Sequence, residues 1–161
     1  MSKTVSRAEP LVAVNAVSHL AIEASDLTRS ISFYETVLGL DIFQDNRGDA
    51  HQPNIKGLIG GFGIELAQTK IASDRRMHPA KAGEQGCPCL SFSIADARSA
   101  FQRLKAAGHT HAEAITAFQG AQFFFVTDPD GYIFELIEFP GNLKTLSDLA
   151  PLLRGSECRF R

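Results

Sequence analysis

The residues of this chain that are best suited to chemistry recur at one fixed offset. When the chain is shifted by 70 residues, His19 falls on Cys89 and Glu65 falls on Glu135. Imidazole, thiolate and carboxylate are the side chains that bind zinc, iron, nickel and manganese in proteins. The repeat therefore predicts a duplicated half-domain that carries metal-ligand side chains at matching positions.

The repeated segments each open with an alternating apolar pattern, over residues 15–24 and 87–95. Alternation with a period of two predicts a strand that buries one face and exposes the other. His19 lies on the less apolar face of the first strand, and Cys89 and Ser91 lie on the same face of the second. The two strands are therefore expected to present these side chains for binding.

A helix is predicted after each of these strands. Asp26 and Asp96 follow them directly, and a short carboxylate at this position accepts hydrogen bonds from the free amides of a first helical turn. Gly39 and Gly108 suit the left-handed residue that closes a helix. Both copies therefore read as strand, helix and then further strands.

The later strands are easier to predict in the second copy. Residues 111–118, 121–127 and 132–139 read as strands, with Asp-Pro-Asp-Gly at 128–131 as the turn between the last two. The corresponding stretch of the first copy, residues 45–60, contains three glycines, a proline and several polar residues. It predicts irregular strands or a loop that shapes the mouth of a cavity.

The chain divides into two modules with polar or irregular flanks. The predicted parts are a flexible N-terminus (1–13), a first βαβββ module (14–69), a linker (70–86), a second βαβββ module (87–140) and a tail with a possible short helix (141–161). The two modules are expected to form one domain, because a chain of 161 residues is long enough for a single well-buried core.

Composition excludes several classes of partner. The formal net charge is −2 with mixed signs along the chain, which argues against a nucleic-acid-binding surface. No apolar run approaches the roughly 20 residues that a membrane span requires, so no membrane partner is expected. The three cysteines do not indicate a disulfide framework. A cytoplasmic location is predicted.

Three motifs resemble the vicinal oxygen chelate superfamily, which includes glyoxalases, extradiol dioxygenases and bleomycin-resistance proteins. They are Val-Ser-His-Leu-Ala-Ile at 17–22, Phe-Tyr-Glu-Thr-Val-Leu-Gly-Leu at 33–40 and Asp-Pro-Asp-Gly-Tyr-Ile-Phe-Glu-Leu at 128–136. The resemblance covers roughly residues 14 to 140. It implies an α+β fold in which two tandem βαβββ modules form a curled mixed sheet, an open barrel around a central cavity.

The resemblance also implies a metal site with ligands from the first and last strand of each module. The matching positions here are His19, Glu65, Glu135 and Cys89. One imidazole and two carboxylates can hold Fe²⁺, Zn²⁺, Ni²⁺ or Mn²⁺ and leave positions open for a substrate. Cys89 departs from the family pattern, which usually has His or Gln there, and it is either a thiolate ligand or a residue of the pocket floor.

The leading hypothesis is a metal-dependent glyoxalase-like lyase or isomerase. Its small-molecule substrate would chelate the metal through vicinal oxygens, Glu65 and Glu135 would act in catalysis, and His51 and Ser91 would line the substrate pocket. One alternative is an Fe²⁺-dependent extradiol-type dioxygenase, although those enzymes usually have His where Glu65 stands. Another is a metal-free binding protein of the bleomycin-resistance type. A homodimer is expected, because open half-sheets leave edges that a second subunit can cover.

Overall fold

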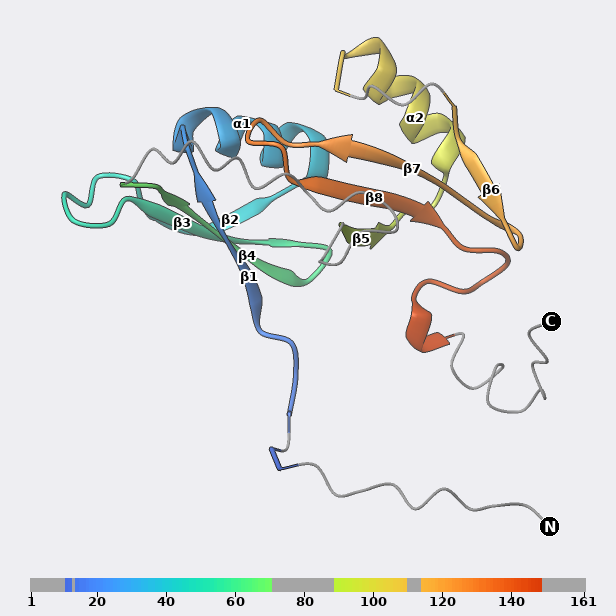
Figure 1. The fold of residues 1–161 in the computed structure, drawn as a ribbon, viewed down its shortest axis with the longest axis horizontal. Coiled ribbons are helices and arrows are strands. Elements are labelled where there is room, and N and C mark those ends of the chain that lie inside the picture. The colour runs from blue at the N-terminus through green and yellow to red at the C-terminus, as the bar shows by residue number, and fades with distance from the viewer. Residues whose placement is uncertain (1–10, 13, 71–88, 110–113, 149–161) are drawn as a thin grey trace.

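The protein is described by a computed structural model that covers residues 11, 12, 14–70, 89–109 and 114–148. Two helices and eight strands occur in these residues (Figure 1). In chain order they are β1 (His19–Ala24), α1 (Leu27–Leu38), β2 (Asp41–Asn46), β3 (Asn54–Ile59), β4 (Phe62–Gln68), β5 (Leu90–Ser93), α2 (Ala97–Ala106), β6 (Thr116–Phe118), β7 (Ala121–Thr127) and β8 (Ile133–Glu138).

The strands form two four-stranded sheets with the same topology. The first has the order β1-β4-β3-β2 and the second the order β5-β8-β7-β6. The first and last strands of each module are parallel, with Ala21 opposite Glu65 and Ser91 opposite Glu135. These registers preserve the 70-residue offset, so the duplication predicted from the sequence is confirmed at the level of individual residue pairs.

The α+β class with two βαβββ modules is confirmed, but the sheets do not close into a barrel within the chain. Each sheet ends at its own edge strands, and hydrogen bonding between strands does not pass from one sheet to the other in the part of the chain that the structure describes. Figure 1 shows α1 and α2 on the same side of the two sheets. Neither described helix covers the opposite face of either sheet, which we call the open face.

The first module is more regular than its sequence predicts. Residues 47–53 form a loop, as predicted for part of the stretch 45–60, but β3 is a regular strand that pairs antiparallel with β2, with a bulge between Ile42 and Gln44. Gly57 explains the difference: a Cβ atom there would lie 2.6 Å from the backbone oxygen of Asp41. A glycine that reads as a loop signal is here the residue that lets two backbones approach.

The predicted helix ends are confirmed. The side chain of Asp26 accepts a hydrogen bond from the amide of Arg29 at 3.0 Å, and Asp96 accepts one from the amide of Ser99 at 2.8 Å. Gly39 closes α1 with φ 69°. Gly108 comes directly after Ala107, the C-cap of α2, and has φ 75°, a conformation that costs glycine little.

One apolar core joins the two modules between the sheets and the helices. Its largest fully buried side chains include Tyr34, Phe124, Phe134, Ile55, Ile64 and Leu66. The ring of Tyr34 on α1 lies edge to face with that of Phe134 on β8, with 5.7 Å between centroids. Each such buried side chain contributes about 1.5–3 kcal/mol. The core therefore fixes the two modules to each other and leaves the open faces to the site.

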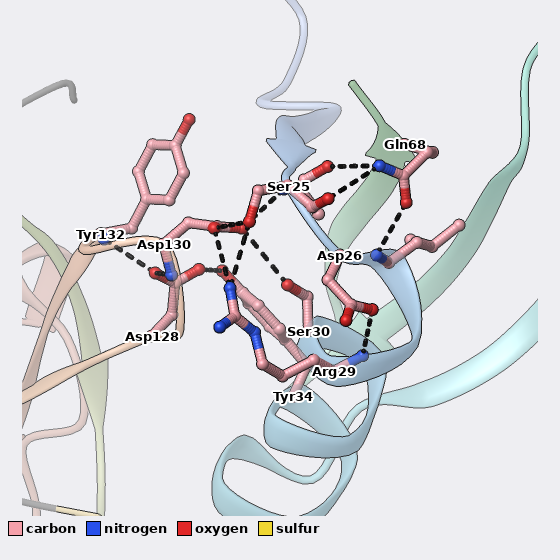
Figure 2. Close-up of polar contacts among 11 residues, drawn as sticks. Ser25, Asp26, Arg29, Ser30, Tyr34, Gln68, Asp128, Asp130 and Tyr132 are labelled. Atoms are coloured by element: carbon pink, nitrogen blue, oxygen red, sulfur yellow. Dashed lines mark hydrogen bonds and ion pairs between the residues drawn. The ribbon is translucent and has the colours of Figure 1, made fainter. Parts of the chain in front are cut away.

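Polar contacts also cross between the modules, as Figure 2 shows. The hydroxyl of Tyr34 donates to Asp128 Oδ2 at 2.9 Å, inside the core. Nearby, Asp130 accepts a hydrogen bond from the backbone amide of Ser25 at 2.9 Å and pairs with Arg29 at 3.3 Å. These contacts connect α1 and the residue before its N-cap to the turn between β7 and β8, and we refer to them as the junction.

Burial raises the pKa of Asp128 above its ordinary value of 3.8, although hydrogen bonds from the Tyr132 amide and the Tyr34 hydroxyl act in the opposite direction. The native state therefore holds this proton more strongly than the unfolded chain does. The resulting contribution to stability is fully present below pH 3.8 and is lost as the pH rises through the raised pKa.

Asp128→Asn should remove this contribution, because an amide does not titrate. We expect the difference in free energy of unfolding, wild type minus variant, to fall as the pH rises from below 4 towards neutrality. Urea unfolding of both proteins over that range measures the difference and cancels the carboxylates that they share. A difference that increases with pH would contradict the assignment.

Several predicted segments lie wholly or partly outside the described residues. These are most of the N-terminus (1–13), nearly all of the linker (70–86), the beginning of the strand expected at 111–118, and the tail beyond residue 148. In the tail, a helical turn begins at Leu146. Neither helix that the structure describes is long and apolar enough to cross a membrane.

Candidate functional site

The first half of the candidate site lies on the open face of β1 and β4. His19 Nε2 is 3.6 Å from Glu65 Oε2, and the two side chains are 48% and 21% exposed. Strand alternation explains this placement: Leu20, Ile64 and Leu66 point to the core side, so His19 and Glu65 point away from it. The structure therefore brings together two of the four ligand positions that the resemblance implies.

The spacing of this pair suits a shared metal ion. Two ligand atoms that each lie about 2.1 Å from a tetrahedral ion are about 3.4 Å apart. The observed 3.6 Å is close to that value. Within residues 14–70, 89–109 and 114–148, however, no group of three or more His, Cys, Asp and Glu side chains lies close enough to hold one ion. The described part of one chain therefore brings together two of the four candidate ligand positions.

Gly63 is the residue that allows His19 to stand where it does. It lies opposite His19 in the β1–β4 pairing. A Cβ atom at position 63 would lie 2.7 Å from the backbone oxygen of Ser18 and 2.9 Å from Cβ of His19. Real Cβ atoms do not approach so closely, so any side chain here must displace β1 and the imidazole with it.

We expect Gly63→Ala to destabilise the protein by about 1–3 kcal/mol, because the added methyl overpacks two paired strands. It should also weaken any metal binding that depends on His19. Urea unfolding and metal titration of the variant measure both effects. Gly48→Ala is the matched control, because a Cβ atom there meets nothing within 4 Å. Equal metal affinity in the two variants would contradict the role of Gly63.

The second half of the candidate site lies on the open face of β5 and β8. Ser91 is the register partner of Glu135, and its hydroxyl donates a hydrogen bond to the Glu135 carboxylate. Cys89 precedes β5 and is half-buried. By the 70-residue offset, its position in the second module is equivalent to that of His19 in the first. The two halves are thus equivalent rows on two different sheets.

His51 lies away from these rows, in the loop between β2 and β3. It is exposed, and its backbone amide donates to the side chain of Asp49 at 2.7 Å. Among the described residues, no hydrogen bond or ion pair joins it to His19, Glu65 or Glu135. Its place in a substrate pocket stays a prediction.

Three residues that sequence reasoning did not single out as site residues share these faces. Lys56 on β3 is opposite Glu65, and Phe125 on β7 is opposite Glu135. Phe123 lies two residues before Phe125 and therefore on the same side of β7. The strand pattern places Phe123 and Phe125 on one face, because only alternate residues of the run at 123–125 share a face. The position of Phe125 opposite Glu135 depends on the register.

Comparison with protein families gives a direct match to these two modules. Residues 16–136 match the family described as Glyoxalase/Bleomycin resistance protein/Dioxygenase superfamily. The chain belongs to this superfamily. Among sequence relatives, a lactoylglutathione lyase of Salmonella typhimurium is 28% identical over 122 residues, which is 74% of this chain and 90% of the relative. The uncharacterized protein YaeR of Escherichia coli is 29% identical over 133 residues, 80% of this chain and 99% of that protein.

Solved structures show the same superfamily fold. A glyoxylase/bleomycin resistance protein/dioxygenase domain from Frankia sp. EAN1pec has a TM-score of 0.64 at 20% identity, over 81% of this chain and 96% of that one. A mutant of the fosfomycin resistance protein FosX from Listeria monocytogenes, complexed with Mn(II) and 1S,2S-dihydroxypropylphosphonic acid, has a TM-score of 0.63 at 18% identity. The match covers 81% of this chain and 95% of the FosX chain. These superfamily likenesses establish the fold.

Proposed function

We propose that this protein is a metal-dependent lyase or isomerase of the glyoxalase type, acting on a small molecule that presents two adjacent oxygens. The observation that carries the proposal is the His19–Glu65 pair, whose atoms are spaced for one divalent ion. The Mn(II) complex of the FosX mutant and the name of the lyase relative support the same chemistry. Fe²⁺, Zn²⁺, Ni²⁺ and Mn²⁺ all suit such a donor set.

We further propose that a second copy of the chain completes the site with its Glu135. The described part of one chain gathers only two ligands, and both open faces carry exposed side chains, including Phe43 and Leu58 on the first sheet and Phe125 on the second. Placing the first-module face of one copy against the second-module face of another would bring His19 and Glu65 to Glu135. In a symmetric homodimer this contact occurs twice and gives two sites.

The residues have distinct parts in this proposal. His19 and Glu65 hold the ion, which when bound supplies a Lewis acid for a substrate carbonyl. Glu135, at the opposite wall, would be the third ligand, and its carboxylate would accept a proton from the carbon next to the bound oxygens. The hydroxyl of Ser91 donates to Glu135 and orients its carboxylate. Cys89 lines the floor beside Ser91.

The two alternatives predict different reactions. An extradiol-type dioxygenase would consume oxygen, and the one imidazole among the proposed ligands argues against it. A binding protein without chemistry would hold an aromatic ligand, which the exposed Phe125 favours. Neither a dioxygenase nor a binding protein would exchange the carbon-bound protons of an α-hydroxyketone with solvent.

Proton exchange tests the proposal. Protein loaded with each metal in turn is incubated in D2O with α-hydroxyketones and α-ketoaldehyde adducts of thiols, and exchange at the carbon next to the carbonyl is followed by NMR. We expect metal-dependent exchange that Glu135→Gln abolishes and Glu35→Gln, an exposed change on α1, leaves intact. Oxygen uptake with catechols and no exchange would favour the dioxygenase instead.

A further inference from the structure

Two phenylalanine rings stand beside Glu135 on the open face of the second module. Ser91, Glu135 and Phe125 are cross-strand partners, so they form one row across β5, β8 and β7. Phe123 follows on the same face, and its ring centroid is 5.8 Å from that of Phe125 in an edge-to-face arrangement. Phe124 points to the other side and is buried in the core.

This ring pair presents an apolar surface to the site. Phe125 is 41% exposed and Phe123 is half-buried. On β8, Ile133 and Ile137 flank Glu135 on the same face, opposite Thr127 and Phe123. The carboxylate that would act on a substrate is therefore bordered by aromatic and aliphatic side chains.

The charges on the open faces are predominantly negative. Over the eight strands of the structure, the acidic residues on these faces are Asp41, Glu23, Glu65 and Glu135, while Lys56 is the sole lysine or arginine. A bound divalent ion would offset two of these negative charges. The acidic side chains of the strands would still outnumber the basic ones on these faces. An anionic substrate would therefore meet repulsion, whereas an uncharged one would not.

We propose that the substrate is an uncharged aromatic compound with two adjacent oxygens, and that its ring packs on Phe123 and Phe125. The oxygen-binding part of this inference rests on the proposed function. The ring-binding part rests on the row that joins Phe125 to Glu135. Such a substrate differs from the phosphonate of the FosX complex, whose negative charge has no matching cluster of basic side chains among the eight strands that the structure describes.

Two ketols that differ only in the ring test the inference. Hydroxyacetone and 2-hydroxyacetophenone carry the same pair of oxygens, with a methyl group or a phenyl ring beside them. Calorimetric titration of the metal-loaded protein should show the aryl compound binding about tenfold more tightly, because its ring is removed from water. Phe125→Leu, which keeps the apolar volume but loses the ring, should weaken aryl binding roughly threefold to tenfold.

Phe118→Leu is the matched control. Phe118 is an exposed ring on the edge strand β6, opposite Ala121 and so four residues along β7 from Phe125, and its change should leave the affinity unchanged. Equal affinities for the two ketols, no effect of Phe125→Leu, or tighter binding of 1,2-dihydroxypropylphosphonic acid than of the aryl ketol would overturn the inference.

Metal content measured on the same samples separates the two proposals. A protein that holds no metal but still prefers the aryl ketol would retain this inference and lose the proposed function, while a metal-binding protein without that preference would do the reverse.

Discussion

A Glu65→Gln variant is expected to bind divalent metal at least about a hundredfold more weakly than the wild type, since loss of even an outer-shell partner costs about 10–100-fold. The reason is that the amide removes the negative charge facing His19 while preserving the size of the side chain. The fold should persist, because Glu65 lies on the open face and its strand neighbours Ile64 and Leu66 supply the core contacts. Competition titration with a chelator of known affinity measures the change.

Glu23→Gln is the matched control for this prediction. Glu23 lies on the same face of β1, four residues after His19, and is exposed. Its removal subtracts the same charge from the same sheet without removing a proposed ligand. Equal losses of affinity in the two variants would mean that Glu65 acts only through general electrostatics, which would contradict its role as a ligand.

A second large effect is expected at the junction between the modules. Tyr34→Phe should lower the free energy of unfolding by about 1–3 kcal/mol, because it leaves a buried acceptor of Asp128 without its donor. Tyr34 is 0% exposed and Asp128 is 5% exposed, so water does not readily replace the lost hydrogen bond. Burial and the neighbouring Asp128 raise the pKa of Tyr34, so the hydroxyl stays protonated as a donor. Urea unfolding at neutral pH measures the loss.

Tyr132→Phe controls for the removal of a hydroxyl group as such. Tyr132 contributes its backbone amide to Asp128 at 2.8 Å, and its hydroxyl points away from the junction in Figure 2. We expect this variant to keep nearly all of its stability. A double variant of Tyr34→Phe with Asp128→Asn should lose less than the sum of the two single changes, and strict additivity would show that the two side chains are not coupled.

The parts of the fold that local signals specify could be predicted from the sequence. Asp26 and Asp96 begin helices as capping residues, and the turn at 128–131 separates β7 from β8. The 70-residue offset predicted that Glu65 and Glu135 occupy equivalent positions in the two modules, and their registers agree. Each of these signals acts within a few residues or repeats in the sequence, so no tertiary information was required.

Features that depend on contacts between distant residues were not accessible in this way. Gly57 reads as a loop residue, although it permits a close approach to Asp41 in a regular sheet. The Tyr34–Asp128 hydrogen bond joins residues 94 positions apart, and periodicity places Tyr34 in the core without naming its partner. The separation of Glu135 from the His19–Glu65 pair depends on how whole sheets are arranged, which local patterns do not encode.

Metal content of a co-expressed pair of variants tests the central claim most directly. Glu65→Gln damages the first-module half of each site and Glu135→Gln the second-module half, so each variant alone should hold little metal. If the two variants pair at random, about half of the homodimers are mixed, and each mixed dimer has one intact site. The mixture should therefore hold about one ion for every four chains. Elemental mass spectrometry of the purified mixture should find that fraction. Metal in the Glu135→Gln variant alone at the wild-type level would contradict the claim, as would a mixture that contains both chains in mixed dimers and holds none.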